Sequence, residues 1–252
     1  MFYGVITKMT SENSLLSAAE EIGAEFEGLL ERAAVNDSGH ARLSFCLCLT
    51  IAELYIGALA VLRSRAQSHA PVLVRSMHEA LADLRNLVAN PAYFDQIRFD
   101  NATQMLKTFR GFLSDPDLRN DKEVQQDMGA WLTKEQQVHD ELQARGLKSL
   151  KQYDKFKQAN MTGEYATGYR VLCSFTHSNL TTLLARHGGE DHLRFTHPLP
   201  LESFKMILRL AINFYIRTLE TLPKYTNLTI KEVQTATDAA TLGSRGKLIF
   251  VD

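Results

Sequence analysis

An arginine and a histidine lie seven positions apart in the segment Tyr169 to His177, "YRVLCSFTH". On a helix this separation is almost two full turns, so Arg170 and His177 would share one face. An imidazole can move the proton of a hydroxyl, and a guanidinium binds the phosphate charge that develops during phosphodiester cleavage. This is the chemistry of RNA cleavage without a metal, because RNA carries its own 2′-hydroxyl nucleophile. A histidine on an apolar helix is also often a buried structural residue, so the spacing leaves both interpretations open.

A second arginine lies on another predicted helix, "PVLVRSMHEALADLRNLV", which begins at Pro71. Arg75 and Glu79 are one turn apart there, a spacing at which opposite charges stabilise a helix by about 0.3–0.5 kcal/mol. Either this pair faces solvent and has no further role, or it faces a cleft in which Glu79 orients Arg75.

Other kinds of catalytic site are not indicated. The sequence contains no GxxxxGK[ST] phosphate loop, no GxSxG elbow, no HExxH and no CxxC. The loop "HGGEDHLRFTH" carries His187, His192 and His197, but their five-residue spacing fits no helical face. The sequence therefore predicts no cofactor and no bound metal, with a metal site in this loop as the alternative.

One stretch is clearly basic. "LKSLKQYDKFKQAN" carries four lysines against a single aspartate, namely Lys148, Lys151, Lys155 and Lys157 against Asp154. The formal net charge of the chain is −1, so any contact with a nucleic acid must use such a local patch. We expect these four lysines to bind an RNA backbone.

The elements that position these residues are helical by their apolar periodicity. Helices are expected at about residues 11–35, 39–65, 69–90, 92–113, 118–146, 162–186 and 201–222. The short apolar runs "FYGVIT" and "KLIFVD" predict extended or irregular termini. The sequence thus predicts one all-α domain over residues 1–252, a multi-helix bundle with a charged, partly protruding segment at 118–160 and a C-terminal tail at 224–252.

The apolar run from Leu43 to Leu62 has the length of a membrane span. Glu53 lies near its centre, where a charge costs about 2.5 kcal/mol or more in lipid, so we expect a buried core helix and no membrane contact. The three cysteines lie in apolar stretches and are odd in number, which favours a reduced, cytoplasmic protein without disulfides.

Two segments together resemble a bacterial family of domains of unknown function. "AQSHAPVLVRSMHEALADLRNLVANP", residues 66–91, is similar to its A-x-x-L-x-R-S-x-x-E-A-x-x-D-L helix. "YRVLCSFTHSN" is similar to its Tyr-x-x-Leu-Ser-x-x-x-His segment, with Cys173 where serine is usual. The similarity spans residues 35–220, and that family in turn distantly resembles the HEPN superfamily of higher eukaryote and prokaryote nucleotide-binding domains.

The resemblance to HEPN proteins implies a helical bundle that forms a homodimer, and an endoribonuclease of a toxin–antitoxin or phage-defence system. It implies His177 as general acid and base, with RNA and a cognate antitoxin or other protein as partners. Arg170 or Arg75 would bind the phosphate, and Glu79 and Tyr169 would orient the site. HEPN nucleases carry a polar residue where this chain has Val171, which is why Arg75 is the alternative to Arg170. The other hypothesis is a non-catalytic helical module that binds a partner protein or a nucleotide.

Overall fold

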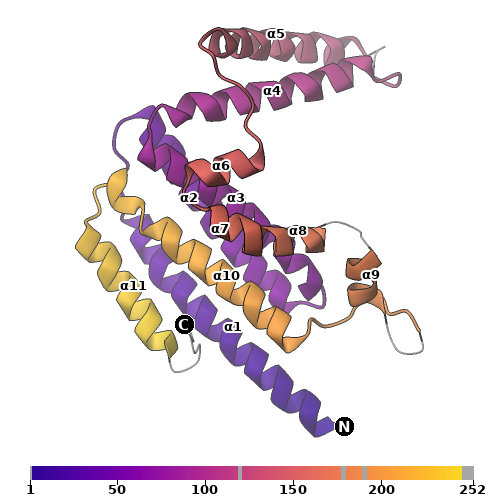
Figure 1. Cartoon of the computed structure of the whole chain (residues 1–252), viewed down its shortest axis with the longest axis vertical. Coiled ribbons are helices and arrows are strands. Elements are labelled where there is room, and N and C mark those ends of the chain that lie inside the picture. The colour runs from indigo at the N-terminus through magenta and orange to yellow at the C-terminus, as the bar shows by residue number, and fades with distance from the viewer. Residues whose placement is uncertain (1, 119–120, 177–179, 189–191, 246–252) are drawn as a thin grey trace.

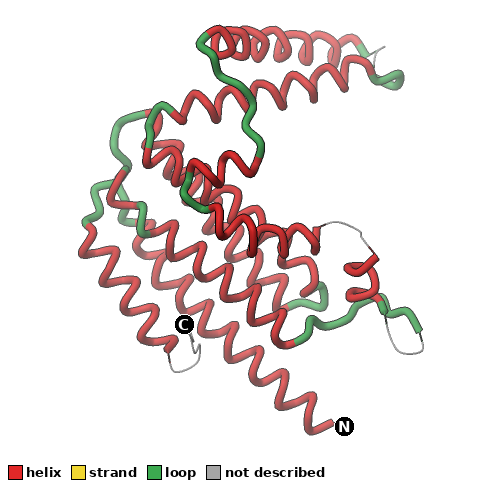
Figure 2. Tube along the Cα trace, viewed as in Figure 1, coloured by secondary structure: helices red, strands yellow, loops and turns green. Residues whose placement is uncertain are grey.

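The computed structural model describes residues 2–118, 121–176, 180–188 and 192–245, and within these ranges every regular element is helical (Figures 1 and 2). The predicted all-α multi-helix bundle is thus confirmed. The elements are α1 (Phe2–Glu31), α2 (Gly39–Arg63), η1 (Gln67–His69), α3 (Ala70–Ala89), α4 (Tyr93–Ser114), α5 (Lys122–Ala144), α6 (Gln152–Gln158), α7 (Thr162–Glu164), η2 (Tyr165–Tyr169), α8 (Arg170–Thr176), α9 (Leu180–His187), α10 (Leu201–Leu219), η3 (Leu222–Lys224) and α11 (Ile230–Arg245).

The core lies among α1, α2, α3 and α10, and α11 packs on the outside of α1 (Figure 1). Each of these helices buries apolar residues three or four positions apart, as a helical face requires. Tyr55 of α2 illustrates the packing, because its ring stacks on that of Tyr215 at 4.5 Å and its hydroxyl donates to the Ala19 carbonyl at 2.7 Å. Helix α2 begins where the Ser38 hydroxyl accepts a hydrogen bond from the Ala41 N–H.

Helices α4 and α5 form a hairpin that projects from the bundle (Figure 1). Leu142 is the one buried residue of α5, so this helix is held mainly by its contacts with α4. The sequence places the projecting segment at 118–160, but α6 at its end returns to the bundle, where Phe156 is fully buried.

Two expectations about the helices are wrong. "FYGVIT" is not extended, because residues 2–7 are part of α1; "KLIFVD" at 247–252 lies outside the described residues. The helix expected at 162–186 is not continuous, since the Thr182 hydroxyl donates to the Ser174 carbonyl. Eight residues of α-helix would separate these positions by about 12 Å, so α8 and α9 are not parts of one straight helix.

Helix α2 is long and apolar enough to span a membrane by length and composition, and among the described residues it is the one helix of that kind. Its buried side chains pack within the bundle against α1, α3 and α10. Helix α2 is therefore part of the core of the bundle, as the sequence predicts.

Candidate functional site

Four side chains from α3, η2 and α8 form a hydrogen-bonded group, which we call the α3–α8 cluster: Arg75, Glu79, Tyr169 and Thr176. The Arg75 guanidinium donates through Nε to Glu79 Oε1 at 2.9 Å, through Nη1 to Thr176 Oγ1 at 2.9 Å, and through Nη2 to the Tyr169 hydroxyl at 3.3 Å. The Tyr169 hydroxyl in turn donates to Glu79 Oε1 at 2.8 Å. The guanidinium is therefore held on three sides by groups from two segments far apart in the sequence.

The local structure of α3 explains why the arginine points at α8. Its apolar positions, among them Val74, Met77 and Leu81, are fully buried in the core. Arg75 and Glu79 lie on the neighbouring stripe, four residues apart, and this stripe faces α8 instead of open solvent. The solvent-facing interpretation of the pair is thus excluded by its contacts.

Tyr169 is the last residue of a π-helical turn, Tyr165–Tyr169. A π turn holds more residues than an α turn, so positions beyond it are displaced from an α-helical count. The Tyr169 ring stacks on that of Tyr165 at 4.9 Å and lies 5.1 Å from the ring of Phe156. These aromatic contacts fix the direction of the phenol that meets Arg75 and Glu79.

The electrostatics keep both Arg75 and Tyr169 in one protonation state. Burial acts against the charge of Arg75, but Glu79 and Tyr169 raise its pKa above the ordinary value. Burial, and then the hydrogen bond to Glu79, raise the pKa of Tyr169, so the phenol stays protonated. The side chains of Arg75 and Glu79 are 27% and 33% exposed, so the cluster is partly in contact with solvent.

The structure brings together Arg75, Glu79 and Tyr169 from the set that the sequence predicts. Arg170 is exposed and makes no hydrogen bond or ion pair with any described residue. His177 lies outside the described residues, directly after Thr176 in the chain. Thr176 itself was not predicted, because a threonine that ends an apolar helix carries no distinctive signal.

A second polar group lies beside the cluster, and the sequence gives little sign of it. The His78 ring is fully buried, stacked on Phe214 at 4.1 Å, with Nε2 3.4 Å from Glu164 Oε2. Neither imidazole nitrogen makes a well-aligned hydrogen bond to a described residue, and burial lowers the pKa of His78. Arg217 Nη1, at 2.6 Å, is therefore the stronger partner of Glu164.

The carboxyl of Glu164 makes stability depend on pH. Burial alone would raise its pKa, but His78 and Arg217 lower it from 4.5 to about 2. The unfolded chain thus takes up the proton first as the pH falls. The contribution of Glu164 to the free energy of unfolding is fully present above about pH 4.5 and is lost as the pH falls to about 2.

We therefore expect the urea midpoints of wild type and Glu164→Gln to differ most near neutral pH, and the difference to shrink as the pH falls from about 4.5 toward about 2. Urea unfolding followed by circular dichroism at several pH values measures this. Glu25→Gln, at an exposed position on α1, is the matched control and should give no such convergence. A difference that stays constant with pH would contradict the assignment.

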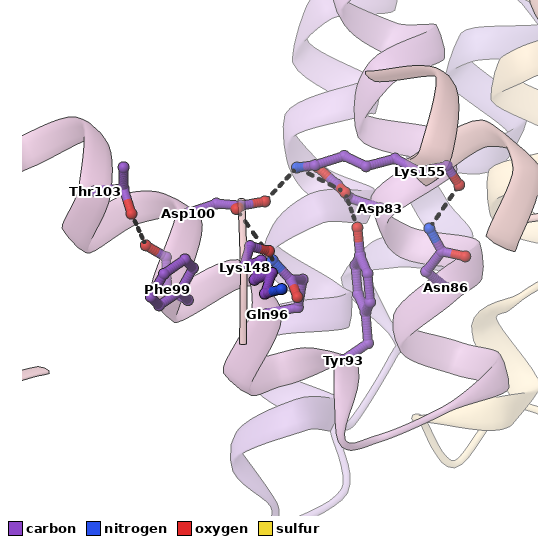
Figure 3. A network of polar contacts seen from close by, with 9 residues as sticks. All are labelled: Asp83, Asn86, Tyr93, Gln96, Phe99, Asp100, Thr103, Lys148 and Lys155. Atoms are coloured by element: carbon purple, nitrogen blue, oxygen red, sulfur yellow. Dashed lines mark hydrogen bonds and ion pairs between the residues drawn. The ribbon is translucent and has the colours of Figure 1, made fainter. Parts of the chain in front are cut away.

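The predicted basic stretch divides into two kinds of lysine. Lys148, Lys151 and Lys157 are exposed, whereas the Lys155 side chain is only 14% exposed. Its ammonium lies 3.3 Å from an Asp83 oxygen and 3.1 Å from an Asp100 oxygen (Figure 3). Lys155 is thus committed to two carboxylates inside the fold and is not free for an RNA backbone.

The Lys155 network extends to the start of the α4–α5 hairpin (Figure 3). The Tyr93 hydroxyl donates at 2.6 Å to Asp83 Oδ1, the oxygen that lies 3.3 Å from the ammonium, and the Asn86 amide donates to the Lys155 carbonyl at 2.9 Å. Burial raises the pKa of Asp83, and Lys155 and Tyr93 oppose that effect. The network therefore joins α3, α4 and α6, and its role is to anchor the hairpin.

The loop at 187–197 does not form a metal site in the part of the chain that the structure describes. No group of three histidine, cysteine, aspartate or glutamate side chains converges among those residues. The Nδ1 atoms of His187 and His197 lie instead near backbone carbonyls, those of Arg194 and Pro198, at 3.1 and 3.0 Å. Glu190 and Asp191 lie outside the described residues.

Comparison with known proteins gives one match. A family model described as a family of unknown function, DUF5677, matches residues 41–193. The chain belongs to the DUF5677 family. No curated protein and no solved structure matches it.

The DUF5677 region is narrower than the 35–220 span expected from the sequence. It runs from α2 through α9, so all four residues of the α3–α8 cluster lie inside it. Helices α10 and α11 and the whole of α1 lie outside it, although α10 and α1 complete the core. The projecting hairpin of α4 and α5 is also part of DUF5677.

Proposed function

We propose that this DUF5677 protein binds RNA and cleaves it without a metal, with Arg75 holding the scissile phosphate and His177 moving the protons. The observation that carries the proposal is the fixed guanidinium of Arg75. A guanidinium has five N–H donors, and three of those of Arg75 are bonded to Glu79, Thr176 and Tyr169. The remaining two suit phosphate oxygens, and the three bonded partners orient them in advance.

Thr176 connects this arginine to the histidine of the proposed site. It accepts a hydrogen bond from Arg75 and directly precedes His177 in the chain. This favours Arg75 over Arg170 as the phosphate-binding residue. The proposed site then contains an arginine and a histidine, as the resemblance to HEPN nucleases implies, but the arginine is Arg75 and not Arg170. The proposed homodimer and the cognate antitoxin rest on that resemblance alone.

In the proposed reaction, His177 takes the proton of the 2′-hydroxyl, and the 2′-oxygen attacks phosphorus. The bond from phosphorus to the 5′-oxygen breaks, the protonated His177 gives its proton to this leaving oxygen, and a 2′,3′-cyclic phosphate remains. Arg75 stabilises the extra negative charge on the phosphate oxygens as the attack proceeds. Glu79 and the protonated Tyr169 keep the guanidinium in place and do not themselves exchange protons.

The requirement for a 2′-hydroxyl gives the test of this function. We expect RNA to be cleaved in the presence of EDTA with 2′,3′-cyclic phosphate ends, and the same sequence as DNA to be left intact. Mass spectrometry of the products identifies the ends. Cleavage of the DNA strand, or RNA products with 3′-hydroxyl ends, would contradict attack by the 2′-oxygen.

The exposed lysines lie on α6, at its start and in the segment that precedes it. Phe156 touches Tyr169, and Lys157 follows it on α6. Tyr153, on the same helix, is 46% exposed and offers a ring on which a base can stack. We therefore assign Lys148, Lys151 and Lys157 to the RNA backbone.

Replacing Lys148, Lys151 and Lys157 together by alanine should weaken binding to all RNA sequences. A single-stranded contact contributes about 0.7 to the slope of log affinity against log salt, so the slope should fall by about 2. Fluorescence anisotropy at several salt concentrations measures it. The control replaces three exposed lysines elsewhere, Lys107, Lys122 and Lys231, with the same change of charge. If the slope falls equally in both variants, Lys148, Lys151 and Lys157 do not form a specific RNA-binding patch.

A further inference from the structure

An apolar groove lies between α1 and α2, away from the α3–α8 cluster. It has a volume of about 790 Å³ and is floored by side chains of α2 together with Tyr215 of α10. Leu49 and Ile56, seven residues apart on α2, are 39% and 58% exposed there. These two residues lie about a third of a turn around α2 from the centre of its buried face, so the bundle leaves an apolar stripe of this helix uncovered.

The rim of the groove is acidic. Four carboxylates and one guanidinium line it, a net charge of −3, from Glu20, Glu27, Glu31, Glu53 and Arg63. Glu20 is paired with Arg63 at 2.7 Å. The other three glutamates are exposed and make no ion pair with any described residue. Three unpaired carboxylates beside an open apolar floor provide the complement of a cationic, amphipathic ligand.

The shape of the groove fits a helix. Its lining extends from Glu20 to Glu31 on α1 and from Phe45 to Arg63 on α2, which correspond to about 17 and 27 Å of helix. Two neighbouring helices present a furrow into which the side chains of a third can pack. An incoming helix of about 12–18 residues would cover the apolar stripe along its length.

The negative charge of the rim also indicates which kind of molecule the groove binds. A second copy of this chain docked through the same groove by two-fold symmetry would bring the same carboxylates together, which like-charge repulsion disfavours. An anionic lipid surface is disfavoured for the same reason. We infer that the groove binds an amphipathic helix of another protein, with leucine-like side chains on one face and lysine or arginine along its flanks.

The test uses two labelled peptides of about 18 residues, one of leucine and lysine with an apolar helical face, and one with glutamate in place of each lysine. We expect saturable binding of the lysine peptide by fluorescence anisotropy and no binding of the glutamate peptide. Ile56→Asp should weaken binding at least about tenfold, because it puts a charge on the apolar floor. Ile230→Asp, at an exposed position on α11, is the matched control and should leave it within about twofold.

A charge swap tests the acidic rim separately. Glu27→Lys with Glu53→Lys should reverse the preference, so that the glutamate peptide binds more tightly than the lysine peptide. Equal binding by wild type and Ile56→Asp, or an unchanged preference after the swap, would overturn the inference. So would dimerisation in sedimentation equilibrium, or binding to phosphatidylcholine vesicles, that Ile56→Asp abolishes, since these identify a second copy or a lipid surface as the occupant.

Discussion

Arg75→Ala is expected to lower the rate of RNA cleavage by about 10²–10³-fold, the usual loss when one preorganised donor to a transition-state oxyanion is removed. The guanidinium is held by Glu79, Thr176 and Tyr169, so its two remaining donors are oriented before the substrate binds. Arg75→Lys keeps the charge but loses the planar fork, and we expect it to recover only part of the rate. Single-turnover cleavage of a labelled RNA measures both variants.

Arg170→Ala is the matched control for this result. Arg170 is exposed and makes no bond to a described residue, so its removal should change the rate by less than about twofold. Circular dichroism and thermal unfolding of each variant separate loss of chemistry from loss of fold. If Arg75→Ala is fully active and Arg170→Ala is inactive, then the phosphate-binding arginine is Arg170, which is nearer to His177 in the sequence.

Lys155→Met is expected to lower the free energy of unfolding by about 3 kcal/mol, the lower end of the cost of breaking a buried ion pair. The ammonium is the shared partner of Asp83 and Asp100, whose side chains are 22% and 20% exposed. Without it, two carboxylates face each other in a poorly solvated place between α3, α4 and α6 (Figure 3). Urea unfolding at neutral pH gives the value.

The same network provides its own controls. Lys157→Met changes an exposed lysine two residues away and should alter stability by no more than about 0.5 kcal/mol. Adding Asp83→Asn and Asp100→Asn to Lys155→Met should restore part of the loss, because the uncompensated charges are then gone. If Lys155→Met is as stable as wild type, the ion pairs contribute nothing and Lys155 is available for another role.

Much of the bundle can be predicted from the sequence, because apolar residues recur with helical spacing along α2, α3 and α10. The same spacing predicts that Arg75 and Glu79 are neighbours. It cannot predict what they face, because that depends on how α3 packs against a segment about a hundred residues later in the chain. The family resemblance predicted Tyr169 as a site residue, whereas Thr176 is identified only from the packing of α8 against α3.

Lys155 shows where a charge pattern misleads. Within "LKSLKQYDKFKQAN" it looks the same as the other lysines, yet it adjoins Phe156, which is drawn into the core. His78 is a comparable case, since it lies in a polar stretch of α3 but on the face that is buried against Phe214. For both residues the sequence gives the residue type and the helix, but the contacts with other helices determine what the side chain does.

The most direct test of metal-independent RNA cleavage compares wild type with His177→Ala on a 5′-labelled RNA in EDTA. The account predicts that wild type produces fragments ending in 2′,3′-cyclic phosphate and that His177→Ala, equally folded and equally able to bind the RNA, produces none. Intact RNA with both proteins, or the same fragments at the same rate from both, would contradict it.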